Sequence, residues 1–182
     1  MAKIKIIEVG MRDGLQNEAV HLSQGQRYQF ARRLAESGHK YIEAGAFVSP
    51  EWVPQMSGSK KLIQKILKAQ KQRVISSKIQ IAALVPNLYG LNQAIEVGVK
   101  EVAIFGAASE TFTKKNINCT VNESMKKFRE VCREAKKNKV KVRGYISTAF
   151  GCPYEGRISK TKVIKVMETM LDMGVYEVSI GD

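Results

Sequence analysis

The sequence predicts an α/β fold built around a parallel β-sheet. Short apolar stretches alternate along the chain with longer amphipathic stretches, which is the pattern of a strand–helix repeat. The long polar loops follow strands, so they gather at one end of the sheet, where a (β/α)8 barrel carries its active site. No G-x-G-x-x-G or phosphate-binding loop follows a strand. An open doubly wound sheet and a barrel both fit, and the polar loops favour the barrel.

The repeat predicts six strands and five helices. The strands are expected at residues 5–9, 41–44, 79–85, 101–105, 140–146 and 176–180. The helices are expected at residues 23–38, 59–70, 88–97 and 159–173, with one more beginning at Thr120. Ser23 and Thr120 are good N-caps, and Glu123 completes a capping box with Thr120. Segments 106–118 and 147–158 are expected to be loops. Because a complete barrel has eight strands, we expect a truncated barrel, one incomplete domain over residues 1–182 that is part of a longer protein.

Composition narrows the function classes. The chain has 182 residues and a formal charge of +13, from 30 Lys and Arg against 17 Asp and Glu. Much of the excess lies at helical spacing in residues 60–73 and 126–139 without interleaved aromatic side chains, so we expect solvated helix faces and no nucleic-acid partner. No apolar run is long enough to cross a bilayer, and strand-like sequence begins close to Met1. These features predict a cytoplasmic protein without a membrane partner.

The three cysteines, Cys119, Cys132 and Cys152, show neither the C-x-x-C spacing of a zinc cluster nor a disulfide framework. Cys132 falls on the apolar stripe of a helix and is expected in the core. The two histidines, His21 and His39, are expected in a loop and at a helix end, away from the strand ends where a barrel would hold a metal.

Polar side chains at the strand ends are the candidate site. In a barrel the following residues would converge on one mouth: Arg12, Asp13, Glu43, Asn87, Ser109, Glu110, Ser147, Ser179 and Asp182. Taken singly, each residue fits a turn or cap, but their joint placement favours function. A carboxylate there suits a hard cation such as Mg²⁺ or Mn²⁺, and an adjacent arginine can neutralise charge that develops on a carbonyl oxygen. This combination is suited to chemistry that passes through an enolate, such as aldol or Claisen reactions and their reversals.

The same segments resemble the hydroxymethylglutaryl-CoA lyase family. The matching blocks keep their order over nearly the whole chain: VGMRDGLQNE (9–18), IEA (42–44), FVSPEWVPQM (47–56), VPN (85–87), AIFGAASE (103–110), FTKKNINC (112–119), RGY (143–145), GCPYEG (151–156) and YEVSIGD (176–182). The resemblance implies a metal-dependent TIM (β/α)8 barrel that cleaves 3-hydroxy-3-methylglutaryl-CoA to acetyl-CoA and acetoacetate. It also implies a place in leucine degradation and ketone-body formation.

The resemblance assigns roles by motif position. Asp13 would be a ligand of Mg²⁺ or Mn²⁺, Arg12 would stabilise the enolate oxygen of the departing acetyl-CoA, and Glu43 would support the site. The residues expected near the acyl-CoA substrate, or just behind those that touch it, are Gln16, Ser109, Ser147, Ser179 and Asp182.

Two departures from the family pattern limit these expectations. The family has Thr-Ser after Glu-Ala, whereas this chain reads Glu43-Ala44-Gly45-Ala46, so a hydroxyl that could touch substrate is missing at Ala46. The family's remaining metal ligands, a His-x-His pair and an asparagine, and its catalytic cysteine lie beyond position 182. One carboxylate does not hold Mg²⁺ against water, so we expect this chain alone to be inactive or nearly so.

Assembly and alternative functions complete the expectations. The open sheet edges of a truncated barrel predict strand-edge association or a homo-oligomer, such as a dimer. One alternative is a Claisen-type acyl-CoA synthase of the same superfamily, making homocitrate or isopropylmalate, which its products would reveal. The other is a non-catalytic barrel half that acts as an assembly module, which need not bind Mn²⁺.

Overall fold

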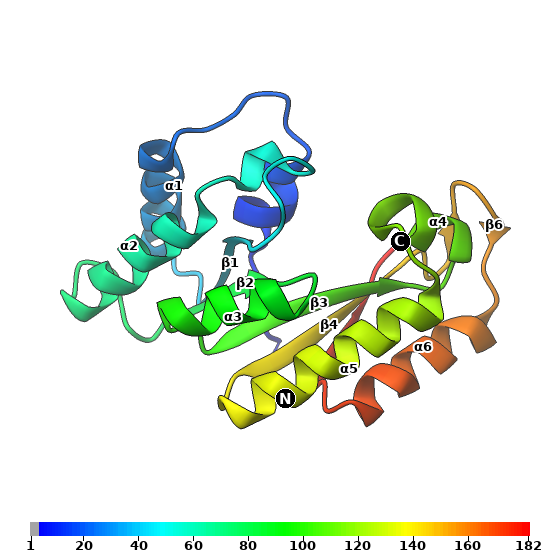
Figure 1. Cartoon of the computed structure of the whole chain (residues 1–182). Coiled ribbons are helices and arrows are strands. Elements are labelled where there is room, and N and C mark those ends of the chain that lie inside the picture. Colours follow the sequence, from blue (N-terminus) through cyan, green and yellow to red (C-terminus); the bar gives the residue numbers. More distant parts are fainter. Residues whose placement is uncertain (1–3) are drawn as a thin grey trace. The chain divides into compact units, whose positions relative to one another are not determined.

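The computed structural model describes residues 4–182, which divide into two compact units (Figure 1). The first unit comprises Met1–Val85 with Asn92–Glu101, and the second comprises Pro86–Leu91 with Val102–Asp182. Each unit contains parallel strands with helices packed against them, as the strand–helix repeat predicts. None of the helices in the described part of the chain is long and apolar enough to cross a membrane. The single domain expected over residues 1–182 stays a prediction.

The first unit is built on two parallel strands. Its elements are η1 (Gly10–Gly14), α1 (Gln24–Glu36), β1 (Tyr41–Ala46), η2 (Pro54–Met56), α2 (Ser59–Lys71), β2 (Gln80–Leu84) and the greater part of α3 (Leu88–Val97). β1 and β2 pair in parallel, and their register shifts between Glu43 and Ala46. Every residue of β1 is buried. The apolar stripe of α2, with Leu62, Ile63 and Ile66 fully buried, faces the interior, as its helical periodicity predicts.

The strand expected at residues 5–9 is reduced to a single bridge, which corrects the sequence prediction. Glu8 pairs in parallel with Ile42, and the amide of Glu8 donates to the carbonyl of Tyr41 at 3.1 Å. The Glu8 carboxylate then accepts from the amide of Gly10 at 2.5 Å, which turns the chain into η1 immediately afterwards. Ile4 remains 88% exposed, so little apolar burial supports a longer strand.

The N-cap predicted at Ser23 is confirmed. The Ser23 side chain accepts from the amide of Gln26, whose side chain accepts in return from the amide of Ser23, so a capping box begins α1. Gly38 follows the helix with φ +93°, a left-handed conformation that glycine adopts without a steric penalty. The helix expected at residues 88–97 is found with those bounds.

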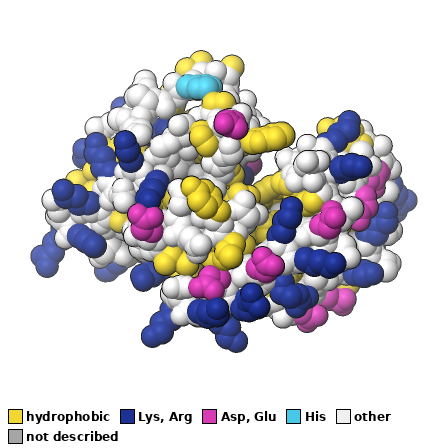
Figure 2. All heavy atoms as spheres, viewed as in Figure 1, with side chains coloured by type: hydrophobic (Ala, Val, Ile, Leu, Met, Phe, Trp, Pro, Cys, Tyr) yellow, Lys and Arg dark blue, Asp and Glu magenta, His cyan; other side chains and the backbone are white. Residues whose placement is uncertain are grey.

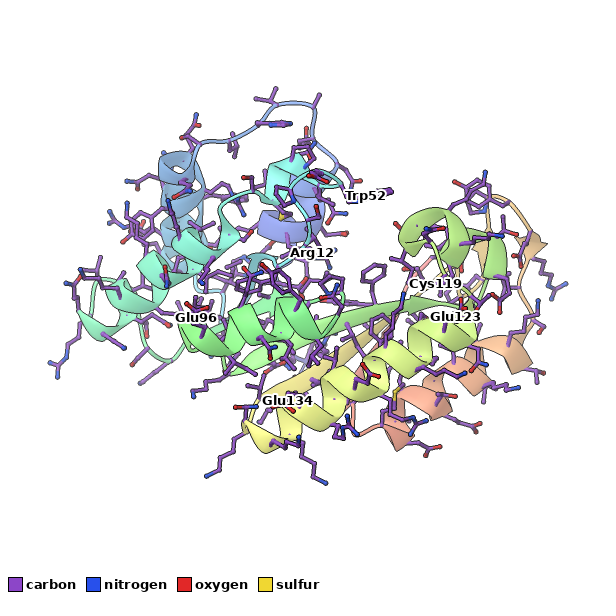
Figure 3. All side chains as sticks on the ribbon, viewed as in Figure 1. Arg12, Trp52, Glu96, Cys119, Glu123 and Glu134 are labelled. Atoms are coloured by element: carbon purple, nitrogen blue, oxygen red, sulfur yellow. The ribbon has the colours of Figure 1, made fainter. Side chains whose placement is uncertain are left out.

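The second unit contains a parallel sheet whose strands follow the order β3-β4-β7. Its elements are the greater part of β3 (Glu101–Ala107), α4 (Glu110–Ile117), α5 (Val121–Lys137), β4 (Lys141–Ser147), β5 (Gly151–Cys152), β6 (Gly156–Arg157), α6 (Lys160–Asp172) and β7 (Glu177–Ile180). Both α5 and α6 pack against β4 (Figure 1). Phe128, Val131 and Met170 are almost completely enclosed and form the core between these helices and the sheet. The capping box predicted for Thr120 and Glu123 is present at the start of α5, and Figure 3 labels Glu123 there.

Two segments expected to be loops contain regular structure. Segment 106–118 contains α4, an eight-residue helix that begins after the N-cap Ser109 and ends where Asn118 adopts φ +50°. Segment 147–158 contains the short antiparallel hairpin formed by β5 and β6. Both corrections have the same physical reason, because these short polar elements are held by capping and tertiary hydrogen bonds that hydrophobic periodicity does not reveal.

The positive charge is spread over the surface. On the face in Figure 2, Lys and Arg side chains are scattered and interspersed with acidic residues, without forming one basic stripe. The helices α2 and α5 carry their lysines and arginines opposite their buried apolar residues. This distribution is that of solvated helix faces, as the spacing of the basic residues predicts.

Candidate active site

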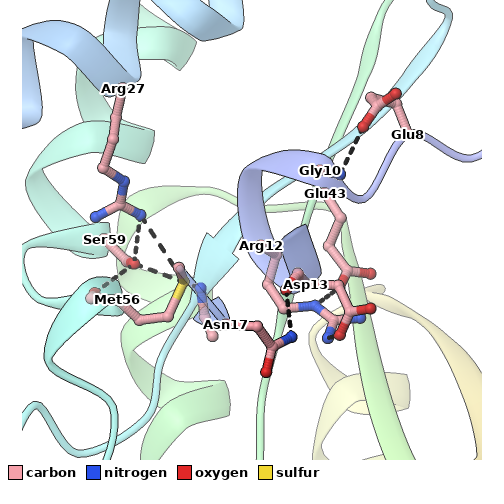
Figure 4. Close-up of polar contacts among 10 residues, drawn as sticks. Glu8, Gly10, Arg12, Asp13, Asn17, Arg27, Glu43, Met56 and Ser59 are labelled. Atoms are coloured by element: carbon pink, nitrogen blue, oxygen red, sulfur yellow. Dashed lines mark hydrogen bonds and ion pairs between the residues drawn. The ribbon is translucent and has the colours of Figure 1, made fainter. Parts of the chain in front are cut away.

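A buried ion pair between Arg12 and Glu43 is the centre of the candidate site (Figure 4). Arg12 lies in η1 and is 7% exposed, whereas Glu43 lies in β1 and is fully enclosed. The Nε–H of Arg12 donates to Oε1 of Glu43. Nη1 of the same guanidinium donates to Oδ1 of Asp13 at 2.5 Å. Glu43 therefore anchors one edge of the guanidinium, and Asp13 contacts it from the solvent side.

The turn that presents this pair is a single π-helical segment. The carbonyl of Val9 accepts from the amides of Arg12 and Asp13, at 3.0 and 2.7 Å. A Cβ atom on Gly10 would lie 2.7 Å from Oε1 of Glu8, so a larger residue there would have to displace the Glu8 carboxylate. Single π-helical turns occur frequently at functional sites, and this one sets Arg12 inward and Asp13 outward.

Asp13 is the residue of this group best able to reach a ligand. Its side chain is 57% exposed, and its backbone carbonyl accepts from Nδ2 of Asn17 at 2.9 Å, which helps to fix the turn. An exposed carboxylate is a suitable oxygen donor for a hard divalent cation. Within residues 4–182, no group of three or more His, Cys, Asp or Glu side chains could hold a metal ion. Gln16 follows in the next turn of the chain and is half-buried.

The remaining predicted site residues lie in the second unit. Ser109 is fully buried as the N-cap of α4, where its hydroxyl accepts from the amide of Phe112 at 3.1 Å and lies 3.1 Å from Sγ of Cys152. The Asp182 carboxylate accepts from the amides of Phe150 and Gly151, at 3.1 and 2.9 Å. Ser109 therefore fixes the first turn of α4 and Asp182 fixes loop backbone, and the contact of both side chains with substrate stays a prediction.

Ser147 and Ser179 lie on neighbouring strands of the same unit. Ser147 is the last residue of β4, and its carbonyl accepts from the amide of Ala108 at 3.3 Å. Ser179 lies in β7 opposite Tyr145 of β4. The structure thus brings Arg12, Asp13 and Glu43 together within the first unit. It places the other predicted residues in the second unit, namely Ser109, Ser147, Ser179 and Asp182.

Glu155 makes a polar contact that the sequence interpretation did not single out. Its Oε1 atom accepts from the amide of Thr111 at 2.6 Å, in the first turn of α4. This hydrogen bond holds the pKa of the Glu155 carboxyl below its ordinary value. Nearby, burial opposes ionisation of Cys152, but its hydrogen bond with Ser109 and the hydrogen bond that it accepts from the amide of Tyr154 bring the pKa of the thiol below its usual value. The matching block GCPYEG contains Cys152 and Glu155 and is the sequence signal that could have pointed to them.

Comparison with known proteins identifies relatives over nearly the whole chain. The HMGL-like family model matches residues 3–182. The chain is 47% identical over 180 residues to the mitochondrial hydroxymethylglutaryl-CoA lyase of Gallus gallus, covering 99% of this chain and 58% of that protein. It is 46% identical over 180 residues to the 3-hydroxy-3-isohexenylglutaryl-CoA/hydroxy-methylglutaryl-CoA lyase of Pseudomonas aeruginosa, with the same coverage of 99% and 58%.

Solved structures agree with these relatives. The hydroxymethylglutaryl-CoA lyase of Pseudomonas aeruginosa superimposes with a TM-score of 0.90 at 44% identity, over 99% of this chain and 58% of that chain. A hydroxymethylglutaryl-CoA lyase from Acinetobacter baumannii, in complex with coenzyme A and 3-methylmalate, gives a TM-score of 0.87 at 29% identity, over 97% of this chain and 55% of that one. The chain therefore spans a little over half the length of the relatives it matches. The predicted partial (β/α)8 barrel is confirmed, and the chain belongs to the HMGL-like family.

Proposed function

We propose that this chain forms part of a metal-dependent hydroxymethylglutaryl-CoA lyase, which cleaves 3-hydroxy-3-methylglutaryl-CoA to acetyl-CoA and acetoacetate. The observation that carries the proposal is the buried Arg12–Glu43 pair with the exposed carboxylate of Asp13 beside it. That arrangement places a fixed positive charge next to a solvent-exposed carboxylate, in a chain whose relatives include lyases of this name.

Arg12 has the central part in the proposed reaction. When the C3 hydroxyl of the substrate loses its proton and becomes the ketone of acetoacetate, the bond between C2 and C3 breaks. Its electron pair passes into the thioester enolate, which becomes acetyl-CoA on protonation. The Arg12 guanidinium would stabilise the negative charge on that enolate oxygen. Because Glu43 and Asp13 already hold the guanidinium, little reorganisation is needed as the charge develops.

Asp13 would contribute to holding a divalent cation, Mg²⁺ or Mn²⁺. When bound, such a cation polarises substrate oxygens. The exposed carboxylate fits this part, but a single carboxylate does not compete with water for Mg²⁺, so the proposal requires further ligands from outside residues 4–182. We accordingly expect the 182-residue chain alone to show little or no turnover.

The test is a cleavage assay on 3-hydroxy-3-methylglutaryl-CoA with Mg²⁺ or Mn²⁺, run on this chain and on any longer reading frame that contains it. In the longer protein, Arg12→Gln should lower kcat by about 10²–10³, the usual effect of removing one stabilising donor. Arg33→Gln, an exposed arginine of α1, is the matched control and should leave kcat unchanged. Absence of acetyl-CoA and acetoacetate from every longer form would refute the lyase proposal. Condensation products from acetyl-CoA would instead indicate the synthase.

Compartment and assembly are part of the proposal. We place the protein in the cytoplasm, although several relatives are mitochondrial.

We also propose that the 182-residue chain self-associates, because Ile6 is 68% exposed beside the Glu8 bridge and Ile180 is 42% exposed in β7. A monodisperse monomer by light scattering would contradict association.

A further inference from the structure

Arg27 is the largest fully buried side chain of the described residues, with 1% exposed. It lies in α1, and the partners of its guanidinium are neutral. Nη1 donates to the carbonyl of Ser57 at 2.9 Å, and Nη2 donates to Oγ of Ser59 at 3.2 Å and to Sδ of Met56 at 4.0 Å (Figure 4). Its Nε–H has no partner among residues 4–182. Burial lowers the pKa of Arg27. A buried cation without a carboxylate is costly, so its presence suggests a role beyond stability.

The hydroxyl of Ser59 connects Arg27 to the end of β1. Ser59 is 3% exposed, and its Oγ atom accepts from Arg27 and from the amide of Ala46 at 3.4 Å. The same hydroxyl donates to the carbonyl of Met56 at 2.7 Å. One side chain therefore joins α1, the last residue of β1 and the loop that follows this strand. We call the Arg27–Ser59 contact with these bonds the strand-end clamp.

The strand is irregular at the point where the clamp holds it. Glu43 pairs with Ala82, and Ala46 pairs with Leu84, so β1 contains one extra residue between Glu43 and Ala46. At Gly45, within this irregularity, a Cβ atom would lie 2.7 Å from Oγ of Ser59 and 3.2 Å from Nη2 of Arg27. The clamp thus fills the space beside Gly45 and bonds the strand immediately after it. Two residues before Gly45 stands Glu43, the carboxylate that accepts from Arg12.

We propose that Arg27 is a positioning residue for the Arg12–Glu43 pair. Acting through Ser59, it fixes the irregular end of β1 and so sets the Glu43 carboxylate where the Nε–H of Arg12 donates to it. The catalytic meaning of this coupling rests on the lyase function proposed above. All the residues of this coupling lie in the first unit, so the coupling can be measured in the chain without substrate or metal.

The test uses the 182-residue chain labelled with ¹⁵N-arginine and observes the side-chain Nε–H resonance of Arg12. Arg27→Met removes the donors at similar side-chain length, and Ser59→Ala removes only the hydroxyl. Both should shift the Arg12 resonance and speed its exchange with water by about tenfold, because the hydrogen bond to Glu43 is loosened. Arg33→Met, on the exposed side of the same helix, is the matched control and should change neither quantity.

A purely structural role for Arg27 would lower thermal stability and leave the Arg12 resonance in place. An unchanged resonance in folded Arg27→Met, or in Ser59→Ala if Arg27→Met does not fold, therefore overturns the proposal. Where association of the chain broadens the spectrum, hydrogen–deuterium exchange of the Gly10–Gly14 turn gives the same comparison by mass spectrometry. Lyase activity does not enter these readouts, so a failed cleavage assay refutes the proposed function, while an unmoved Arg12 signal refutes the clamp.

Discussion

Removing either member of the Arg12–Glu43 pair should lower the free energy of unfolding substantially, and the two losses should not add when both members are removed. Glu43→Gln removes the enclosed carboxylate that accepts from the Nε–H of Arg12 and leaves the 7% exposed guanidinium with the exposed Asp13. Removing one member of a buried pair costs about 3–5 kcal/mol, whereas an exposed pair contributes at most about 1 kcal/mol. Because Asp13 still contacts the guanidinium, we expect the lower end, a loss of about 3 kcal/mol in the free energy of unfolding.

The double-mutant cycle isolates the pair. Arg12→Met alone leaves the Glu43 carboxylate buried without that donor and should also cost about 3 kcal/mol. In Arg12→Met/Glu43→Gln neither charge remains, so the double variant should lose much less than the sum, with a coupling energy of about 2–3 kcal/mol. Urea unfolding followed by far-UV circular dichroism at neutral pH and one protein concentration measures all four proteins, with unchanged m-values as the control for two-state behaviour. Additivity within about 0.5 kcal/mol would refute the argument that the two buried charges depend on each other.

Two further predictions concern titratable groups of the second unit. The hydrogen bond from the amide of Thr111 lowers the pKa of Glu155, so its stabilising effect is complete above the ordinary glutamate pKa of about 4.3 and is lost as the pH falls through the folded value. Glu155→Gln should therefore lower Tm at neutral pH, and the difference from the parent chain should shrink in acid, whereas a constant difference would contradict this assignment. Burial raises the pKa of Cys132 to about 11, so this thiol should resist iodoacetamide at neutral pH in the native chain and react in urea. Rapid labelling of Cys132 in the native chain, mapped by mass spectrometry, would contradict this prediction, because it would show that the buried face of α5 becomes exposed to solvent.

The strand–helix pattern and the helix caps were accessible from sequence because each depends on local chemistry. Thr120 with Glu123 is a short-range signal that needs no tertiary contact, and the apolar stripe of α5 encodes its own buried face. The strand expected at residues 5–9 is reduced to a single bridge for a reason that hydrophobic periodicity does not reveal. A carboxylate captures the amide two residues later and turns the chain. The short helix α4 was missed because it is mostly polar and depends on the caps Ser109 and Asn118.

In the candidate site, too, some features were predictable from the sequence and others were not. The residues Arg12, Asp13 and Glu43 were predicted from their places at strand ends, and the structure brings them together. What the sequence could not supply is burial: an arginine in an amphipathic helix normally lies in solvent, whereas Arg27 is 1% exposed and donates to Ser59. The engagement of Asp182 with two loop amides was likewise invisible, because it joins residues separated by about thirty positions.

The two carboxylates that contact Arg12 differ in exposure, and this difference separates their roles. Glu43 is fully enclosed, so it cannot exchange its partner for a metal ion without opening the strand, whereas the Asp13 side chain is 57% exposed. On the proposed function, Glu43 anchors the guanidinium and Asp13 is free to bind the cation. Asp13→Asn should therefore change the free energy of unfolding by less than about 1 kcal/mol, because exposed pairs contribute little. In a longer, active protein it should abolish the response of cleavage to Mn²⁺, whereas Glu43→Gln should lower stability first. If Asp13→Asn destabilised the chain as much as Glu43→Gln, the exposed carboxylate would have to be assigned a structural part, and the metal would need a different ligand.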